Sequence, residues 1–365
     1  MRMLYKVLIN LIAVATLLIL LYGLITSELQ VNRKTVSREN RTLSLVGLNK
    51  KHETKARISN VTSATRADKR TSEAEPINVW CTFTKVQSNY QMKMKFKTFL
   101  LSMLEHSSVR INLHVITDSS SRSSGEDVIH SVQNTNKKYF TVSYYDIDEA
   151  TDRVSDIVAA MQPHFSSQPG SYYSDALFFL SLGLHRIAEQ QERAIMFDID
   201  TKFLADVADL FREFDSFGRK TVLGMAPELT PVYHHVLHSY RRKHKGTLFG
   251  DPPSRGGFPG VNSGVVLLHL KQMRKSEEYH RLLQSQSVTQ LASKYNFKGH
   301  LGDQDFVTLL AWERPEFVKI LPCNWNRQLC TWWRDHGYRD VFDQFFECSG
   351  PIYLYHGNCN TPIPA

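Results

Sequence analysis

From residue 77 onward, apolar positions occur in short blocks whose spacing alternates between the strand period and the helix period. Residues 77–84 are mostly β-branched or aromatic, which predicts a strand, and the apolar residues of 90–106 recur at helical spacing. The same patterns predict the following elements: strands over 111–117, 140–145 and 193–197, and helices over 127–138 and 172–189. Because strands and helices alternate, we expect an α/β fold with a Rossmann-like parallel sheet.

The N-terminal stretch has a different pattern, because residues 7–26 contain no charged side chain. About 20 apolar residues at about 1.5 Å each cross the ~30 Å hydrocarbon core of a bilayer. A cleaved signal peptide has a shorter apolar core followed by small residues, which the Thr26-Ser27-Glu28 junction does not provide. We therefore predict a signal-anchor over 7–26 behind a cytoplasmic tail of residues 1–6, as in a single-pass type II membrane protein.

Residues 27–75 are polar and have no sustained apolar period, so they cannot bury enough apolar surface to fold alone. We predict a flexible stem there, followed by a lumenal catalytic domain over 76–365. Glycosylation sequons at Asn40 and Asn60 favour a lumenal stem, whereas Lys and Arg flank the apolar run on both sides and do not orient it. We expect the endoplasmic reticulum membrane, with the Golgi as the alternative, because span length does not sort reliably between them.

Nearly all of the net charge of +8 over 365 residues lies in the N-terminal tail. Residues 1–75 hold 13 Lys and Arg against 6 Asp and Glu, whereas the remaining residues hold 31 against 30. The predicted catalytic domain is therefore almost neutral and has no electrostatic footprint for nucleic acid. Gly-x-Gly-x-x-Gly and P-loop patterns are also missing, so dinucleotide and ATP chemistry are not indicated.

Four of the five cysteines lie close to the C-terminus: Cys323, Cys330, Cys348 and Cys359. No two are spaced as Cys-x-x-Cys, so a zinc ribbon is not indicated. In an oxidising lumen they would form two disulfides, for which three connectivities are open. Cys81 stands alone, and the sequence assigns it no role.

Two acidic residues, Asp198 and Asp200, follow the apolar strand 193–197. In extended geometry, residues two apart point to the same side, so their carboxylates would repel each other unless a cation lay between them. A hard divalent cation fits that place and would also hold a diphosphate. Haloacid-dehalogenase-type phosphatases share the pattern, but they need Thr or Val at the position of Lys202.

Three further motifs follow the acidic turn in a fixed order: Asn262-Ser263-Gly264 before a predicted strand 265–270, Leu301-Gly302-Asp303-Gln304-Asp305, and His356-Gly357 after a predicted strand 352–355. Together with Asp198-Ile199-Asp200, they resemble the motif set of the family-8 retaining glycosyltransferases. The resemblance covers about 77–365. It implies a GT-A fold with a mixed central sheet and transfer with retention at the anomeric carbon.

The resemblance also implies roles for individual residues. Asp198, Asp200 and His356 match the ligands of Mn²⁺, for which imidazole is a suitable donor. Asp303 and Gln304 match positions beside the anomeric carbon, although Asp303 would also suit the N-cap of an apolar helix over 306–312. The positions that match donor-binding residues are Phe83, Thr84, Lys85, Asp198, Ile199, Asn262, Ser263, Asn358 and Asn360.

The chain departs from the family pattern after the terminal histidine. Many members carry there a Lys that contacts the diphosphate, whereas His356-Gly357 is followed by Asn-Cys-Asn-Thr-Pro. Asn358 or Asn360 would have to supply neutral hydrogen bonds instead.

Segments 172–177 and 356–362 resemble those of members that transfer xylose from UDP-xylose, in an alpha-1,3 linkage, to a xylosyl-glucose O-glycan. The resemblance thus implies UDP-xylose as donor and O-glycosylated EGF-like repeats as protein acceptor. Trp332 and Trp333 are expected either to offer the acceptor an aromatic face or to belong to the local core. The Gly- and Pro-rich segment 246–260 is expected to be a lid over the donor or a plain surface loop.

Alternatives to this interpretation have different consequences. In the first alternative, the protein is a family-8-like transferase that uses UDP-glucose or UDP-galactose as donor. Xylose differs from glucose by only one hydroxymethyl group, so the residues alone do not identify the donor sugar. A non-catalytic sugar-binding relative would bind without turnover, and a phosphatase would release phosphate from a phosphomonoester. The sequence predicts no oligomeric state.

Overall fold

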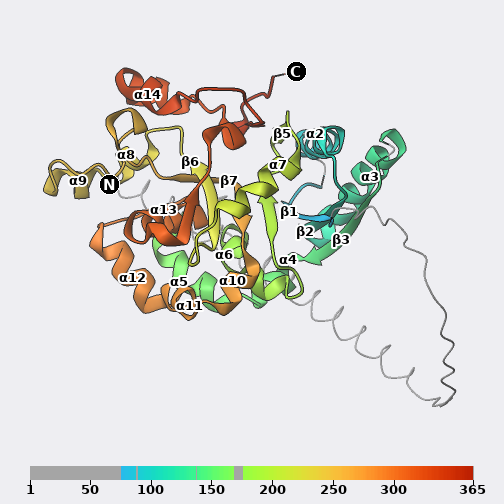
Figure 1. Ribbon diagram of the computed structural model, residues 1–365, viewed down its shortest axis with the longest axis horizontal. Coiled ribbons are helices and arrows are strands. Elements are labelled where there is room, and N and C mark those ends of the chain that lie inside the picture. The colour runs from blue at the N-terminus through green and yellow to red at the C-terminus, as the bar shows by residue number, and fades with distance from the viewer. Residues whose placement is uncertain (1–74, 88, 137, 168–175, 365) are drawn as a thin grey trace, which may run out of the picture. The chain divides into compact units, whose positions relative to one another are not determined.

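The computed structural model describes residues 75–364 except 88, 137 and 168–175. In this part of the chain the central sheet has seven strands in the order β3-β2-β1-β4-β7-β6-β8 (Figure 1). Its strands are β1 (Ile77–Phe83), β2 (Ile111–Thr117), β3 (Phe140–Asp146), β4 (Ala194–Phe197), β6 (Leu223–Pro227), β7 (Val261–Leu268) and β8 (Val318–Ile320). A second sheet, in the order β5-β10-β9, consists of β5 (Thr201–Phe203), β9 (Arg327–Gln328) and β10 (Leu354–His356).

Strand direction divides the central sheet into two halves. β1 pairs in parallel with β2 and β4, and β2 pairs in parallel with β3, which confirms for these four strands the parallel Rossmann-like sheet predicted from the sequence. β7 runs antiparallel to both β4 and β6, and β8 runs parallel to β6. The sheet is therefore mixed, as the family resemblance implies.

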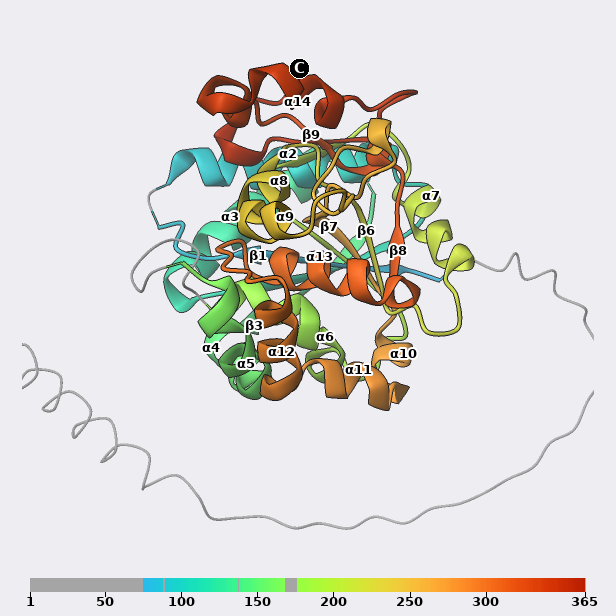
Figure 2. The ribbon, with the colours of Figure 1, turned by 90° about the vertical axis from the view of Figure 1, so that its left-hand side faces the viewer.

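Helices cover both faces of the central sheet. One face carries α2 (Tyr90–His106), α3 (Ser119–Thr135) and α7 (Val207–Arg212). The other carries α4 (Ile147–Asp152), α5 (Ser155–Phe165), α6 (Leu180–Ile187), α10 (Leu270–Lys275), α11 (Glu277–Leu282), α12 (Ser285–Lys294) and α13 (Asp303–Glu313). Figures 1 and 2 both show α10, α11 and α12 on the side opposite to α2. The remaining helices are α8 (Val232–Val236), α9 (His238–Lys243) and α14 (Arg339–Phe346).

Alternating side chains of the strands fill the two cores. In β4, Ala194 packs into the core beneath α5, α6 and α13, whereas Ile195 and Phe197 pack into the core beneath α2 and α3. Both faces of this short strand are thus apolar, as is typical of a strand covered by helices on both sides. The buried side chains hold the end of β4 in place, and Asp198 is the next residue.

The sequence predicted β1, β2, β3, β4 and α2 to within one residue. A helix was correctly predicted at α3 but with wrong bounds, since it spans Ser119–Thr135 rather than 127–138. The Asp118 carboxylate accepts a hydrogen bond from the Ser121 amide at 2.9 Å, and this cap starts the helix in a polar first turn without apolar periodicity. α4 and α5 were not predicted.

Other predicted elements are shifted. Of the helix predicted over 172–189, residues 172–175 lie outside the described part; a 3₁₀ turn (Ala176–Phe179) and the short α6 follow. The strand predicted over 265–270 begins earlier, at Val261, and the one predicted over 352–355 is the shorter β10. α13 begins at Asp303 with Gly302 at the N-cap, so Asp303 is not the cap.

The small sheet joins the C-terminal segment to the acidic turn. β5 directly follows Asp200, and β10 pairs antiparallel with it so that His356 lies opposite Thr201. Two disulfides hold the same segment, Cys323–Cys348 and Cys330–Cys359, which selects one of the three open connectivities. Cys81 is a free thiol buried in the core.

No helix within the described residues is both long enough and apolar enough to cross a bilayer. The predicted anchor over 7–26, the sequons at Asn40 and Asn60, and the stem up to residue 74 lie outside the described residues.

Candidate active site

Three ligand groups that are distant in sequence meet at the end of β4. One ligand atom each of Asp198, Asp200 and His356 lies within 4.8 Å of the others. The His356 Nε2 atom is 3.5 Å from an Asp198 oxygen and 3.4 Å from an Asp200 oxygen. The turn itself is held by backbone hydrogen bonds, because Asp198 donates to the Gly264 carbonyl at 2.9 Å and Gly357 donates to the Asp200 carbonyl at 2.8 Å.

The His356 ring is buried and held on two sides. Its Nδ1 atom is 3.0 Å from the side-chain oxygen of Asn326, whose amide nitrogen donates to the Asn262 side-chain oxygen at 2.9 Å. Since Asn326 presents its oxygen to the ring, Nδ1 carries the proton, and Nε2 faces the two carboxylates. A hydrogen bond of this kind fixes the tautomer that leaves Nε2 as the metal ligand.

Gly264 makes room for this ring. A Cβ atom at Gly264 would lie 2.2 Å from His356 Cε1 and 2.4 Å from Nδ1, well inside contact distance. The glycine of the Asn262-Ser263-Gly264 motif is therefore required by the histidine of the terminal motif.

His356 places a positive charge beside the two acidic side chains of the cluster. Burial lowers the pKa of His356, but its hydrogen bonds to Asp198 and Asp200 and their charges outweigh burial and raise the pKa to about 10. Burial raises the pKa of Asp200, but the hydrogen bond and charge of His356 and the charge of Lys95 lower it overall. The cluster thus consists of two carboxylates and an imidazolium.

The donor set fits a divalent cation. Two carboxylate oxygens and one imidazole nitrogen converge from one side, and Asp198 leaves the other side open, since its side chain is 53% exposed. Such mixed oxygen and nitrogen ligands suit Mn²⁺ among several divalent metals. The structure therefore supports the predicted three-residue metal site.

A buried polar chain connects the His356 ring to Gln304. From Asn326 and Asn262 it continues to Glu228, whose Oε2 accepts from the Asn262 side chain at 2.9 Å and from the Gln304 side chain at 3.2 Å. Gln304 in turn accepts the Ser263 amide at 3.1 Å. Since its nitrogen faces Glu228 and its oxygen faces an amide, both groups of the Gln304 side chain have fixed directions.

Asp303 lies beside this chain and is also buried. It accepts hydrogen bonds from the hydroxyls of Ser181 and Ser263. Burial, together with the charge of Asp198, raises the pKa of Asp303 to about 7 despite these hydrogen bonds. The predicted catalytic pair Asp303 and Gln304 therefore lies at the start of α13, close to the acidic turn.

Among the predicted donor-binding residues, Phe83 and Ile199 have side chains that point into the core. The Phe83 ring is buried in the core, 4.6 Å from that of Phe96, and the Ile199 side chain is also in the core. Only the backbone of these two residues is available at the site. Thr84 is half-buried and Lys85 is exposed, with its amide donating to the Asp118 carboxylate at 2.6 Å.

The two asparagines of the terminal motif differ in their contacts. The Asn358 side-chain oxygen accepts the amides of Leu329 and Cys330, at 3.1 and 3.0 Å, so it fastens the chain after β9. Asn360 is exposed, and its side-chain oxygen accepts a hydrogen bond from the Lys95 ammonium at 2.9 Å. A lysine from α2 therefore reaches the terminal motif, which itself contains no Lys or Arg.

The predicted acceptor residues Trp332 and Trp333 lie between Cys330 and Cys348, inside the loops that both disulfides close. Trp332 is 50% exposed and stacks on His336 with ring centres 3.8 Å apart. Trp333 is partly buried and packs against the core and against Tyr338. Trp332 thus presents an aromatic face, whereas Trp333 belongs to the local core.

The segment 246–260 is anchored at its base. Gly250 donates to the Phe258 carbonyl at 2.8 Å, and the Arg241 guanidinium is 2.6 Å from Asp251. The Phe249 ring is buried against Trp312. These contacts favour a surface loop with a fixed base.

Three residues of the site were not predicted: Lys95, Glu228 and Asn326. Glu228 had a signal, because it directly follows the apolar strand β6 as Asp198 follows β4. Asn326 lies in a 3₁₀ turn (Cys323–Asn326) with no periodicity, and Lys95 is one of several lysines on α2.

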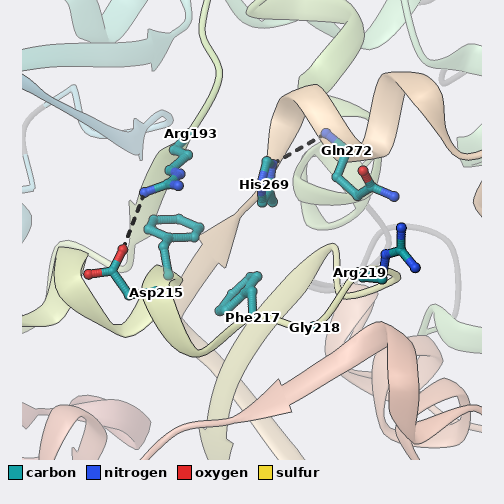
Figure 3. A pocket seen from close by; sticks show the side chains of 8 residues that line it. Arg193, Asp215, Phe217, Gly218, Arg219, His269 and Gln272 are labelled. Atoms are coloured by element: carbon teal, nitrogen blue, oxygen red, sulfur yellow. Dashed lines mark hydrogen bonds and ion pairs between the residues drawn. The ribbon is translucent and has the colours of Figure 1, made fainter.

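A hollow of about 380 Å³ lies elsewhere on the sheet (Figure 3). Its lining includes Arg193, Phe217, Arg219 and His269. Arg193 precedes β4 and His269 follows the antiparallel β7, so the hollow lies at the strand ends away from Asp198. It is not part of the metal site.

The sequence and the fold were compared with those of known proteins. The chain matches no protein-family model. It is 44% identical over 288 residues to xyloside xylosyltransferase 1 of Homo sapiens, which covers 77% of this chain and 73% of the relative. The crystal structure of mouse xyloside xylosyltransferase 1 in its apo form superposes with a TM-score of 0.74 at 42% identity, over 79% of this chain and 100% of that chain. The bifunctional glycosyltransferase WbbM, at 13% identity, matches 78% of this chain and 46% of its own with a TM-score of 0.51, which shows the fold alone.

The mixed α/β sheet and the Asp198-Asp200-His356 cluster at its edge define a glycosyltransferase with a GT-A-like fold. This assignment excludes the phosphatase alternative. With 44% identity to a relative of which it covers nearly three quarters, the chain belongs to the xyloside xylosyltransferase family.

Proposed function

We propose that the protein transfers xylose from UDP-xylose, with retention, to a xylosyl-glucose O-glycan on EGF-like repeats, and that it uses Mn²⁺. The observation that carries the proposal is the Asp198-Asp200-His356 cluster in a chain 44% identical to a xyloside xylosyltransferase. The donor sugar, the acceptor and Mn²⁺ come from the resemblance and from the relatives' names.

The chain's own groups have distinct tasks in this reaction. Asp198, Asp200 and His356 would hold the cation, which when bound neutralises charge on the departing diphosphate. Gln304 would direct its amide dipole at the anomeric carbon, where positive charge develops. The Ser263 amide and Glu228 hold the two ends of the Gln304 amide in place. Because a neutral amide is a poor nucleophile, no covalent glycosyl-enzyme is expected.

Bond changes follow from retention without such an intermediate. The bond between the anomeric carbon and the diphosphate oxygen breaks, and both electrons stay with the diphosphate. The acceptor hydroxyl bonds to the same face of the sugar, and its proton goes to an oxygen of the leaving phosphate. Asp303, with a pKa raised to about 7, is suited to hydrogen bonding with a donor-sugar hydroxyl.

A donor screen tests the proposal. The purified protein is given UDP-xylose, UDP-glucose or UDP-galactose together with a xylosyl-glucose acceptor, with Mn²⁺ or with a chelator, and UDP release and product are measured. We expect UDP-xylose to be preferred, turnover to require the metal, and NMR to show an alpha-linked product. Preference for a hexose donor would reject xylose as the substrate, and turnover in the chelator would reject the metal.

Two variants separate the metal site from general damage. Asp200→Asn should abolish transfer, whereas Asp209→Asn, on the exposed surface of α7, should leave it unchanged. UDP binding without turnover in the wild-type protein would instead support the non-catalytic relative.

We also propose that the protein is a type II membrane protein of the endoplasmic reticulum. The apolar run 7–26 and two disulfides, which suit an oxidising lumen, support this placement. Protection of the 76–365 segment from protease in intact microsomes tests the topology. Complete digestion would contradict it, and glycans at Asn40 and Asn60 that resist endoglycosidase H would favour the Golgi.

A further inference from the structure

The terminal motif brings a histidine ligand but no Lys or Arg to the site. After His356 the chain runs Gly-Asn-Cys-Asn-Thr-Pro, and Asn358 uses its side-chain oxygen on two backbone amides. A glycosyltransferase that releases a nucleoside diphosphate needs positive charge where the phosphates leave. The structure shows such a charge on a different element.

Lys95 reaches the cluster from α2. Its ammonium is 3.6 Å from an Asp200 oxygen and 2.9 Å from the Asn360 side-chain oxygen, so it contacts both the acidic turn and the terminal motif. Its neighbour Phe96 is fully buried, which fixes the helix, while the Lys95 side chain is 24% exposed. Because the side chain of lysine is a flexible chain of four methylene groups, the ammonium can move while the helix backbone stays in place.

The charges of the site give Lys95 a role once a metal is bound. Two carboxylates and one divalent cation cancel, so the ammonium would then lie beside a neutralised carboxylate and be repelled by the cation. A diphosphate next to the metal supplies the missing anion. We propose that Lys95 contacts the diphosphate of the bound UDP-sugar and stabilises the charge that it gains on leaving.

The inference rests on the proposed function and assigns Lys95 to the same reaction. Lys95 donates hydrogen bonds to phosphate oxygens before and after the glycosidic bond breaks, and it neither gains nor loses a proton. The competing explanation is a structural tether, in which Lys95 only fastens the terminal motif to α2 through Asn360.

Binding measurements distinguish the two explanations. With Mn²⁺ present, calorimetry is used to titrate the wild-type protein and Lys95→Met with UDP and with UMP. We expect UDP binding to weaken about tenfold or more, since a hydrogen bond between charged groups is lost, and UMP binding to change much less. Lys97→Met is the matched control: it lies two residues along the same helix and donates to Ser131 at 3.0 Å, so UDP affinity should not change.

Metal binding without nucleotide gives a second readout. Lys95→Met should bind Mn²⁺ at least as tightly as the wild-type protein by electron paramagnetic resonance, because a repelling charge is removed. Lys95→Arg, which keeps the positive charge, should restore part of the kcat that Lys95→Met loses. Weaker Mn²⁺ binding together with equal losses for UDP and UMP would establish the tether and overturn the proposal.

The result also separates this inference from the proposed function. If the wild-type protein with Mn²⁺ binds no UDP, the proposed function fails. If it binds UDP and Lys95→Met binds UDP equally well, only the role of Lys95 is rejected.

Discussion

The imidazole of His356 lies directly against the backbone of Gly264, and this contact joins two motifs that are far apart in sequence. Gly264→Ala would place a methyl group 2.2 Å from the ring, so the ring must move away from Asp198 and Asp200. We expect Mn²⁺ affinity to fall at least tenfold by calorimetry, with the thermal midpoint lowered by a few degrees. Gly218→Ala, whose nearest contact is the Thr221 hydroxyl at 3.3 Å, is the control. Unchanged Mn²⁺ binding in Gly264→Ala would show that the ring is not a ligand.

The raised pKa of His356 makes metal binding depend on pH. Below a pKa of about 10 the ring carries a proton on Nε2, which the cation must displace. Apparent Mn²⁺ affinity should therefore rise with pH, about tenfold per unit between pH 6.5 and 8.5, with about one proton released per ion. Calorimetry in buffers with different ionisation enthalpies measures that proton, and an affinity independent of pH would contradict the assignment.

Glu228 positions Gln304 without being exposed to substrate. One of its oxygens accepts from the amide and hydroxyl of Thr230, and the other accepts from Asn262 and Gln304. In Glu228→Gln, the new NH₂ group would face other hydrogen-bond donors on one side. An unsatisfied buried donor of this kind lowers stability by about 1–3 kcal/mol. We expect kcat to fall more than tenfold while KM for the donor changes little. The surface variant Glu126→Gln is the control, and a wild-type kcat in Glu228→Gln would reject the positioning role.

Among the elements, those with continuous apolar blocks were predictable and the shortest were not. β1 to β3 and α2 were predicted because each has enough residues to show its pattern, and the four-residue β4 because it is a continuous apolar run. β5 and β9 have three and two residues, too few for any period, although they place His356 beside the acidic turn. The start of α3 depends on the Asp118 cap rather than on apolar spacing.

The two disulfides close loops of similar length, 25 and 29 residues, but differ in what they hold. Cys330 follows β9 and Cys359 follows β10, so their bond fastens the strand that carries His356. Replacing either pair by Ser should lower the free energy of unfolding by about 2–4 kcal/mol.

Only the Cys330/Cys359 double variant should also weaken Mn²⁺ binding, by severalfold. The Cys323/Cys348 double variant serves as the control of similar loop length. Equal Mn²⁺ affinity in both double variants would show that the small sheet holds His356 without the disulfide.

At the scale of the whole molecule, Asp198 and Asp200 were predicted as ligands from their place at a strand end, whereas His356 was predicted only through the order of the motifs. Asp198 and His356 are brought together by the pairing of β5 with β10, which no local pattern predicts. Asn326, Glu228 and Lys95 were not predicted, because their roles depend on contacts with residues distant in sequence. Phe83 and Ile199 matched family positions, yet the fold places their side chains in the core.

The central claim is that Asp198, Asp200 and His356 bind the cation that accompanies UDP. Crystals grown with Mn²⁺ and UDP, with diffraction recorded at the manganese absorption edge, test it most directly. We expect an anomalous peak in contact with both carboxylates, with His356 Nε2 and with the diphosphate. UDP bound in the site with the peak absent, or with the metal held by other residues, would contradict it.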